Sequence, residues 1–302
     1  MRSPRNPPAR AYGILFGAQL AVGAAAIFAR YALTGAEPLA VSALRLAVAS
    51  AVFLGIALAR NQERHILTKR EHSLLLFAGV SLALHFAGWI WSLQFTSVAI
   101  STLLVCSSPI WTAAYDSLVL RRRLAGLGWF GFACGAAGLA MVLRSNVTRV
   151  PVPGHASAGY TLALAGSLAI AAYLILVREV RSELSTRAIV TRTYAYAAGV
   201  LALAALLTHQ APPALANTTA WFGILAMALI SQSLGHTAIN VSLHFFSPSA
   251  ISFATLFEPV VAAALAAALF HETLSALTLY GGLIVLFSIG TVLYAEAARA
   301  RN

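Results

Sequence analysis

Ten long apolar stretches are the feature that most limits how this chain can fold. A transmembrane helix needs roughly 20 mainly apolar residues in a row. The stretches are apolar on every side, whereas the strands of a membrane barrel alternate in polarity over about ten residues. The sequence therefore predicts an all-α membrane protein with ten transmembrane helices, over residues 12–32, 38–59, 73–95, 99–120, 126–143, 159–178, 188–208, 219–240, 249–270 and 276–295.

The composition excludes an ordinary soluble fold. Of the 302 residues, 60% are hydrophobic and 10% are charged, whereas soluble domains are typically about 45–50% apolar and about 25% charged. A water-soluble fold of this length could not bury so much apolar surface. We therefore expect the lipid bilayer to be the solvent of most of the chain.

The basic residues fall in alternate loops and predict the orientation. The net charge is +11, with 20 Lys and Arg in total. When the N-terminus is placed in the cytoplasm, 15 of these lie in cytoplasmic segments and three in outer loops. This bias follows the positive-inside rule and predicts a multi-pass protein of a bacterial inner membrane with both termini cytoplasmic. It also explains the charge without a nucleic-acid partner.

The chain contains an internal repeat. With a constant shift of 150 residues, Leu93 to Met141 aligns with Leu243 to Thr291, and Pro109 aligns with Pro259. Each half, 1–150 and 151–302, then holds five predicted helices. Because five is odd, the second half is expected to be inverted in the membrane, as in many secondary transporters.

The second half carries a set of short motifs, and the second predicted helix carries an arginine: Ser247-Pro248-Ser249-Ala250, Glu258-Pro259, Glu272 with Leu274-Ser275, Gly281-Gly282, and Arg45. On these residues the second half resembles the second EamA domain of the drug/metabolite transporter superfamily, and the resemblance extends over nearly the whole chain. It implies a membrane transporter of small metabolites. The first half departs from the family pattern at Arg122, where members often carry an acidic residue.

Pro109 and Pro259 fall near the middle of the fourth and ninth predicted helices. Proline removes one helical hydrogen bond and crowds the carbonyl four residues earlier. We expect this to free the carbonyls of Val105 and Thr255, which must then face protein or a water-filled cavity. The two prolines are predicted hinges beside a substrate cavity, and the alternative is a pair of tolerated kinks.

Glu258 and Arg45 are charged residues inside predicted spans. An ionised side chain at the centre of a membrane helix costs about 2.5–3.5 kcal/mol on insertion scales unless it is paired, protonated or in contact with water. Glu258 is therefore a candidate for proton coupling, and the alternative is a structural hydrogen bond. Arg45 is a candidate clamp for a substrate carboxylate or a gate residue, and the alternative for Arg45, as for Arg192, is snorkelling to the headgroups.

Two polar stripes complete the candidate site. His85 and Trp89 lie four residues apart in the third helix, and Gln232, His236 and Asn240 are spaced by four in the eighth, so each set shares one helix face. These faces either line the substrate path or form hydrogen bonds between helices. The predicted pathway residues are Gln19, Arg45, His85, Trp89, Gln232, His236, Asn240 and Glu258.

Two local contacts are also predicted. Gly131 and Gly135 form a small-xxx-small pair that permits close packing of the fifth helix on a neighbour. Asp116, near the cytoplasmic end of the fourth helix, is expected to form an ion pair with one of the arginines 121–123.

No phosphate-binding loop, metal-ligand cluster or nucleophile elbow is present in the sequence, so neither an enzymatic activity nor a cofactor is expected. The sequence favours a secondary transporter that exports a small metabolite, such as an amino acid, by alternating access. The substrate site is expected between the first, third, eighth and ninth helices. Proton coupling and a homo-oligomer are left open. The alternatives are an uncoupled facilitator or lipid-group flippase on the same fold and, more remotely, a membrane-embedded enzyme or sensor.

Overall fold

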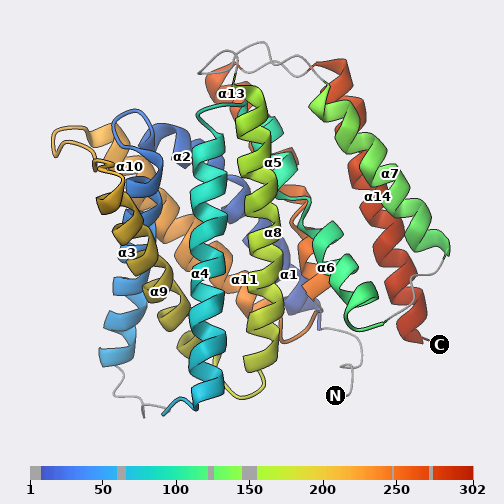
Figure 1. Cartoon of the computed structure of the whole chain (residues 1–302), viewed down its shortest axis with the longest axis horizontal. Helices are drawn as coiled ribbons and strands as arrows, with labels where there is room; N and C mark the ends of the chain where they lie inside the picture. The colour runs from blue at the N-terminus through green and yellow to red at the C-terminus, as the bar shows by residue number, and fades with distance from the viewer. Residues whose placement is uncertain are drawn as a thin grey trace.

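The computed structural model describes residues 8–59, 66–121, 126–144, 155–246, 248–271 and 275–301, and every regular element in these ranges is a helix (Figure 1). The elements are α1 (Ala9–Gly23), α2 (Ala25–Ala32), α3 (Pro38–Ala59), α4 (Lys69–Ser92), α5 (Val98–Val105), α6 (Ser108–Leu118), α7 (Gly126–Leu143), α8 (Ala156–Val180), α9 (Thr186–Leu207), α10 (Thr218–Ala226), the π-helix η1 (Met227–His236), α11 (Thr237–Ser242), α12 (Pro248–Ala254), α13 (Phe257–Phe270) and α14 (Ala276–Arg301).

Eight helical stretches among the described residues are long and apolar enough to cross a membrane. They coincide with the first four predicted spans and with the sixth to ninth. The fifth and tenth predicted spans are the helices α7 and α14, of which α14 contributes a shorter apolar segment, Ala276–Ser288. The all-helical membrane fold is therefore confirmed, whereas the total of ten spans stays a prediction.

Several helices begin at a polar side chain that accepts a hydrogen bond from one of the first free backbone amides, as expected for N-cap residues. Thr68 and Glu71 form a capping box at the start of α4. Ser97 caps α5 by accepting from the amide of Ile100 at 3.3 Å. Ser185 begins α9 in the same way. These polar side chains therefore fix where the three helices begin.

The fourth and ninth spans are each divided into two helices by a turn. Residues 106 and 107 separate α5 from α6, and residues 255 and 256 separate α12 from α13. Pro109 and Pro259 then lie in the first turn of the following helix, where a missing amide hydrogen costs little. The predicted kinks are therefore full breaks. The carbonyl of Thr255 is also not free, because it accepts from the amide of Glu258 at 3.0 Å.

The packing of helices is matched between the two halves. The first span contacts the eighth (α1 with η1), just as the sixth contacts the third (α8 with α4). Likewise, α13 packs on α1 and α5 packs on α8, whereas α3 pairs with α9 and α7 pairs with α14. Helix α1 begins and α14 ends on the lower side of the view in Figure 1, as an even number of spans requires.

Helices α7 and α14 lie side by side at one edge of the molecule (Figure 1). A side-chain atom added to Gly135 would lie 2.8 Å from the hydroxyl of Ser288, and one added to Gly138 would lie 2.7 Å from the carbonyl of Gly281. Small residues therefore let these helices touch, as the glycine pattern of the fifth span predicts.

Two other glycine contacts set the centre of the bundle. A side chain at Gly88 on α4 would meet the carbonyl of Leu162 on α8 at 2.7 Å, and one at Gly235 on η1 would meet Val22 on α1 at the same distance. These close approaches bring α4 to α8 and α1 to η1, and a cavity lies between the two pairs.

Candidate functional site

The cavity has a volume of about 640 Å³, part of it open to solvent, and lies between the two halves of the molecule. Residues from the first, third and fourth spans contribute one part of its wall, and residues from the sixth, eighth and ninth spans contribute the other. The wall consists of Val22, Gly23, Ala26, His85, Trp89, Thr102, Val105, Cys106, Ser108, Ile170, Tyr173, Leu174, His236, Ile239, Thr255 and Glu258.

Glu258 is the only carboxylate among these lining residues. It lies in the first turn of α13, directly after the break in the ninth span, and its side chain is buried. The thiol of Cys106, at the break in the fourth span, donates to one carboxylate oxygen across 3.7 Å. The two broken helices thus meet at this acid, which has no salt-bridge partner within the described part of the chain.

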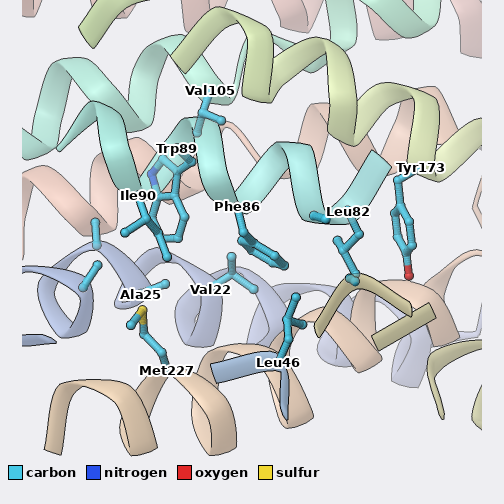
Figure 2. Close-up of a cluster of buried hydrophobic side chains, with 14 of the residues drawn as sticks. Val22, Ala25, Leu46, Leu82, Phe86, Trp89, Ile90, Val105, Tyr173 and Met227 are labelled. Carbon is cyan, nitrogen blue, oxygen red and sulfur yellow. The ribbon is translucent and has the colours of Figure 1, made fainter. Parts of the chain in front are cut away.

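His85, Phe86, Trp89 and His236 form an aromatic cluster beside the cavity. The rings of His85 and Trp89 are parallel at 6.4 Å, and the ring of His236 lies 5.3 Å from that of Phe86. Figure 2 shows Phe86 and Trp89 reaching from α4 toward the first span, in which Val22 belongs to α1 and Ala25 to α2. His85 Nδ1 lies 3.0 Å from the carbonyl of Gly166. Since a carbonyl only accepts, Nδ1 carries the hydrogen.

Arg45 is fully buried and does not line the cavity. Its guanidinium lies 4.0 Å from the ring centre of Phe86 and 5.8 Å from that of Trp89. One nitrogen donates to Gln232 Oε1 across 2.8 Å, and another lies 3.8 Å from the sulfur of Met227. Among the described residues its contacts include no carboxylate. Arg45 therefore places a positive charge behind the aromatic cluster.

Snorkelling, the alternative for both arginines, does not describe Arg45, because a snorkelling side chain keeps its charged group in the headgroup region and this guanidinium is 0% exposed. Arg192 on α9 is half-buried and donates to the carbonyl of Ala188, one turn earlier, across 3.2 Å.

The polar stripe of the eighth span is not a single α-helical face. Residues 227–236 form a π-helix, in which each hydrogen bond spans five residues and spacing by four is less than a full turn. As a result, Gln232 contacts Arg45, His236 lines the cavity, and Asn240 accepts from the hydroxyl of Tyr173 at 3.1 Å. The α-helical spacing assumed from the sequence is wrong for this segment.

The structure brings four of the eight predicted pathway residues to the cavity wall: His85, Trp89, His236 and Glu258. Three others do not line the cavity: Arg45, Gln232 and Asn240. Gln19 on α1 is buried, and neither polar atom of its side chain has a hydrogen-bond partner within the described part of the chain.

Sequence reasoning missed the contribution of the sixth span, including Tyr173, and the polar residues beside the two breaks. Thr102, Cys106 and Ser108 flank the position of Pro109, and Thr255 precedes Pro259 in the same way. The paired prolines could have identified these residues, because each marks the part of a span where the helix opens.

Ion pairs join the ends of α4, α6 and α8 on one side of the molecule. Asp116 contacts Arg178 at 3.8 Å, and Arg70 lies 3.8 Å from both Glu179 and Glu183. Asp116 therefore has an ion-pair partner on α8 that the sequence did not predict. Of its expected partners, residues 122 and 123 lie outside the described residues, as do the family marks Ser247, Glu272 and Leu274 and the departure at Arg122.

The comparisons with known proteins agree with this architecture. The model of the EamA-like transporter family matches twice, over residues 9–144 and 157–294. A solved structure titled only "Crystal structure of protein" matches with a TM-score of 0.69 and 16% sequence identity, over 97% of this chain and 99% of that chain. At that identity the match shows the fold alone. No curated protein matches.

Proposed function

Because the chain belongs to the EamA-like transporter family, whose members are transporters rather than enzymes, we propose that it is a secondary transporter that exports a small metabolite, such as an amino acid, across a bacterial inner membrane. The two halves would be inverted five-helix repeats, with both termini in the cytoplasm. Substrate would reach the cavity from each side in turn.

The observation that carries this proposal is a cavity walled by both halves at the breaks in the fourth and ninth spans. Irregular backbone inside a membrane protein is tolerated where it is buried in protein or lines a water-filled space. Discontinuous helices of matched repeats form the substrate site in several families of secondary transporters. The breaks at Pro109 and Pro259 would act as the hinges of alternating access.

We further propose that Glu258 couples transport to protons. The other titratable groups on the cavity wall are His85, Cys106, Tyr173 and His236. Of these five groups, the carboxyl of Glu258 is the one that ordinarily carries a negative charge near neutral pH. Because an ionised carboxylate in the membrane must be paired, hydrated or protonated, proton uptake and substrate binding at this site would be linked.

The test is transport by purified protein in liposomes that contain a pH-sensitive dye. With the wild type, a gradient of a transported metabolite chosen from a panel should drive proton movement across the liposome membrane. A proton gradient should in turn accelerate movement of the metabolite in the opposite direction. Glu258→Gln should abolish the proton movement. Glu183→Gln, which removes an exposed carboxylate away from the cavity, is the matched control and should behave as wild type.

Three outcomes would contradict the proposal in different ways. Metabolite flux without proton movement in the wild type would indicate an uncoupled facilitator. Movement of labelled lipids in place of metabolites would indicate a flippase. Absence of any flux across the panel would remove the transport function.

A further inference from the structure

We propose that the guanidinium of Arg45 and the side-chain amide of Gln232 together bind a small monovalent anion, such as chloride. The site is separate from the cavity between the two halves, because neither residue belongs to the cavity wall. The ion would be a resident counter-charge and not cargo. This inference therefore goes beyond the proposed transport function and does not depend on it.

The guanidinium of Arg45 is a positive charge enclosed by protein. The side chain is fully buried in the second span, and an arginine keeps its proton inside proteins. A charge without a partner is unfavourable in a protein interior, so buried charges are normally found beside a charge of opposite sign. A negative group is therefore expected next to Arg45.

No carboxylate in the described part of the chain contacts this guanidinium. Glu258, the acid of the cavity, contacts the thiol of Cys106 at 3.7 Å. Five further acidic side chains bind backbone amides or arginines near the ends of helices: Glu37, Glu71, Asp116, Glu179 and Glu183. Among these residues the chain therefore supplies no negative partner for Arg45.

Neutral groups satisfy only part of the guanidinium. The ring of Phe86 covers one face, with its centre 4.0 Å from the central carbon of the guanidinium. Nη2 donates to Gln232 Oε1 across 2.8 Å, and Nη1 lies 3.8 Å from the sulfur of Met227, which is a weak acceptor. Nε has no hydrogen-bond partner in the described residues. Arg45 therefore keeps donor capacity for a further acceptor.

The amide of Gln232 provides a second donor. Because a guanidinium only donates, the oxygen of this amide must face Arg45, and the positions of Oε1 and Nε2 are fixed. The side chain is fully buried, and Nε2 has no hydrogen-bond partner in the described part of the chain. A buried donor without an acceptor is unfavourable. An acceptor is therefore expected beside Nε2 as well as beside Arg45.

Tyr194 is a neighbour of both residues, but it does not supply this acceptor. Its hydroxyl lies 3.3 Å from Thr237 Oγ1 on α11, and it is beyond hydrogen-bonding distance of the Gln232 amide nitrogen. Since Arg45 and Gln232 are held together by their own hydrogen bond, a single ion beside this bond can accept from both.

The surroundings favour an ion that is small and singly charged. Phe86, Trp89 and Met227 lie close around the guanidinium, so little room is left for a larger anion. The edges of aromatic rings carry partial positive charge and are compatible with a halide. One negative charge balances Arg45, whereas a divalent anion would leave an excess negative charge in a low-dielectric interior.

The first test is thermal unfolding of the purified full-length protein in detergent, with sodium gluconate replaced stepwise by sodium chloride at constant sodium concentration. A ligand that binds only the folded state raises the Tm, and the rise increases with the ligand concentration. Chloride and bromide should each raise the Tm of the wild type by several degrees over gluconate, a larger anion. A Tm that is the same in all three salts would overturn the inference.

A substitution separates binding at this site from general effects of salt. Gln232→Glu places a carboxylate at the oxygen that Arg45 already contacts, with almost no change in shape, and should make the Tm independent of chloride. Gln210→Glu is the matched control in the loop before α10, where Gln210 Oε1 accepts from the amide of Leu39 at 2.7 Å. It should keep the full chloride effect. The same chloride effect in both variants would show that the anion acts elsewhere.

Crystals grown in sodium bromide locate the ion without any variant, because bromide scatters X-rays anomalously. An anomalous peak is expected within hydrogen-bonding distance of Gln232 Nε2 and of Nε or Nη1 of Arg45. Peaks confined to the surface of the protein would contradict the inference, even if the Tm depends on the anion.

These measurements require no transport, so two failures can be told apart. If no anion binds at Arg45 but metabolite flux occurs in liposomes, only this inference fails. If the anion binds and no flux occurs across the metabolite panel, only the proposed function fails.

Discussion

Gly88 on α4 and Gly166 on α8 let the two backbones touch, and this contact sets the wall of the cavity that carries His85 and Trp89. A side-chain atom at Gly166 would lie 3.1 Å from the carbonyl of His85, and one at Gly88 would lie 2.7 Å from the carbonyl of Leu162. The neighbours are backbone atoms, which cannot move aside as a side chain can. The position of both cavity residues therefore depends on the absence of a side chain nearby.

Gly88→Ala should destabilise the protein by about 1–3 kcal/mol, the usual cost of overpacking a close contact. Gly199→Ala on α9 is the control, because no atom lies within 4 Å of the added carbon. It should leave stability unchanged or raise it by up to about 1 kcal/mol, since glycine is unfavourable inside a helix. Thermal unfolding in detergent measures both. Equal stability of the two variants would contradict the role of Gly88.

The sequence predicts well which residues are unusual, and less well what they touch. Arg45 and Glu258 stand out because a charge inside a span is costly, and both are buried. Whether such a residue lines the cavity or points away from it depends on how its helix is rotated against its neighbours. Arg45 contacts Gln232, 187 residues later in the chain, and no local pattern encodes that pairing.

Among the elements, η1 is the one that differs most from its expected form. π-helices are rare and occur mostly as single turns, frequently at functional sites, yet here ten residues adopt this form. Hydrogen bonds that span five residues accompany it, including the one from the hydroxyl of Ser233 to the carbonyl of Ala228 at 2.7 Å. The wide turn places Gln232 against Arg45 and His236 at the cavity.

Deletion of Ser233 should allow this segment to form an α-helix. Removing one residue from a helix rotates the residues after it by about 100°, so His236 would leave the cavity wall and Asn240 would lose Tyr173. We expect the variant to fold but to lose transport, as measured in liposomes. Deletion of Leu215, in the exposed loop before α10, is the control. Full transport after removal of Ser233 would show that the π-helical form is dispensable.

The sequence predicts where the fourth and ninth spans depart from a regular helix, but it does not predict whether each departure is a kink or a break. The paired prolines mark both positions, yet proline alone is compatible with a kink or with a complete break. The structure ends one helix before each proline and begins another. Which of the two occurs depends on tertiary contacts at the turn, such as that between Cys106 and Glu258.

At the scale of the whole molecule, the two halves pack in matched pairs around one cavity, and the family match covers both. Hydrophobic length and the 150-residue shift predict this layout, because each is a property of the chain that does not depend on detailed packing. The volume and the wall of the cavity could not be predicted, since they arise from contacts between helices that are distant in sequence.

Alternating access is tested most directly by labelling the cavity from each side of the membrane. Thr255 lines the cavity at the break in the ninth span. A Thr255→Cys variant, made with Cys106→Ser and Cys134→Ser, would be treated with a membrane-impermeant thiol reagent in vesicles of either orientation. Leu215→Cys and Ser182→Cys, in exposed loops, would report the outer and the inner face respectively.

If access alternates, the cysteine introduced in place of Thr255 should react from both faces, and each loop cysteine should react from one face only. A transported metabolite should slow the reaction of the cavity cysteine on either side. Reaction of the cavity cysteine from a single face, or from neither while both loop controls react, would contradict alternating access.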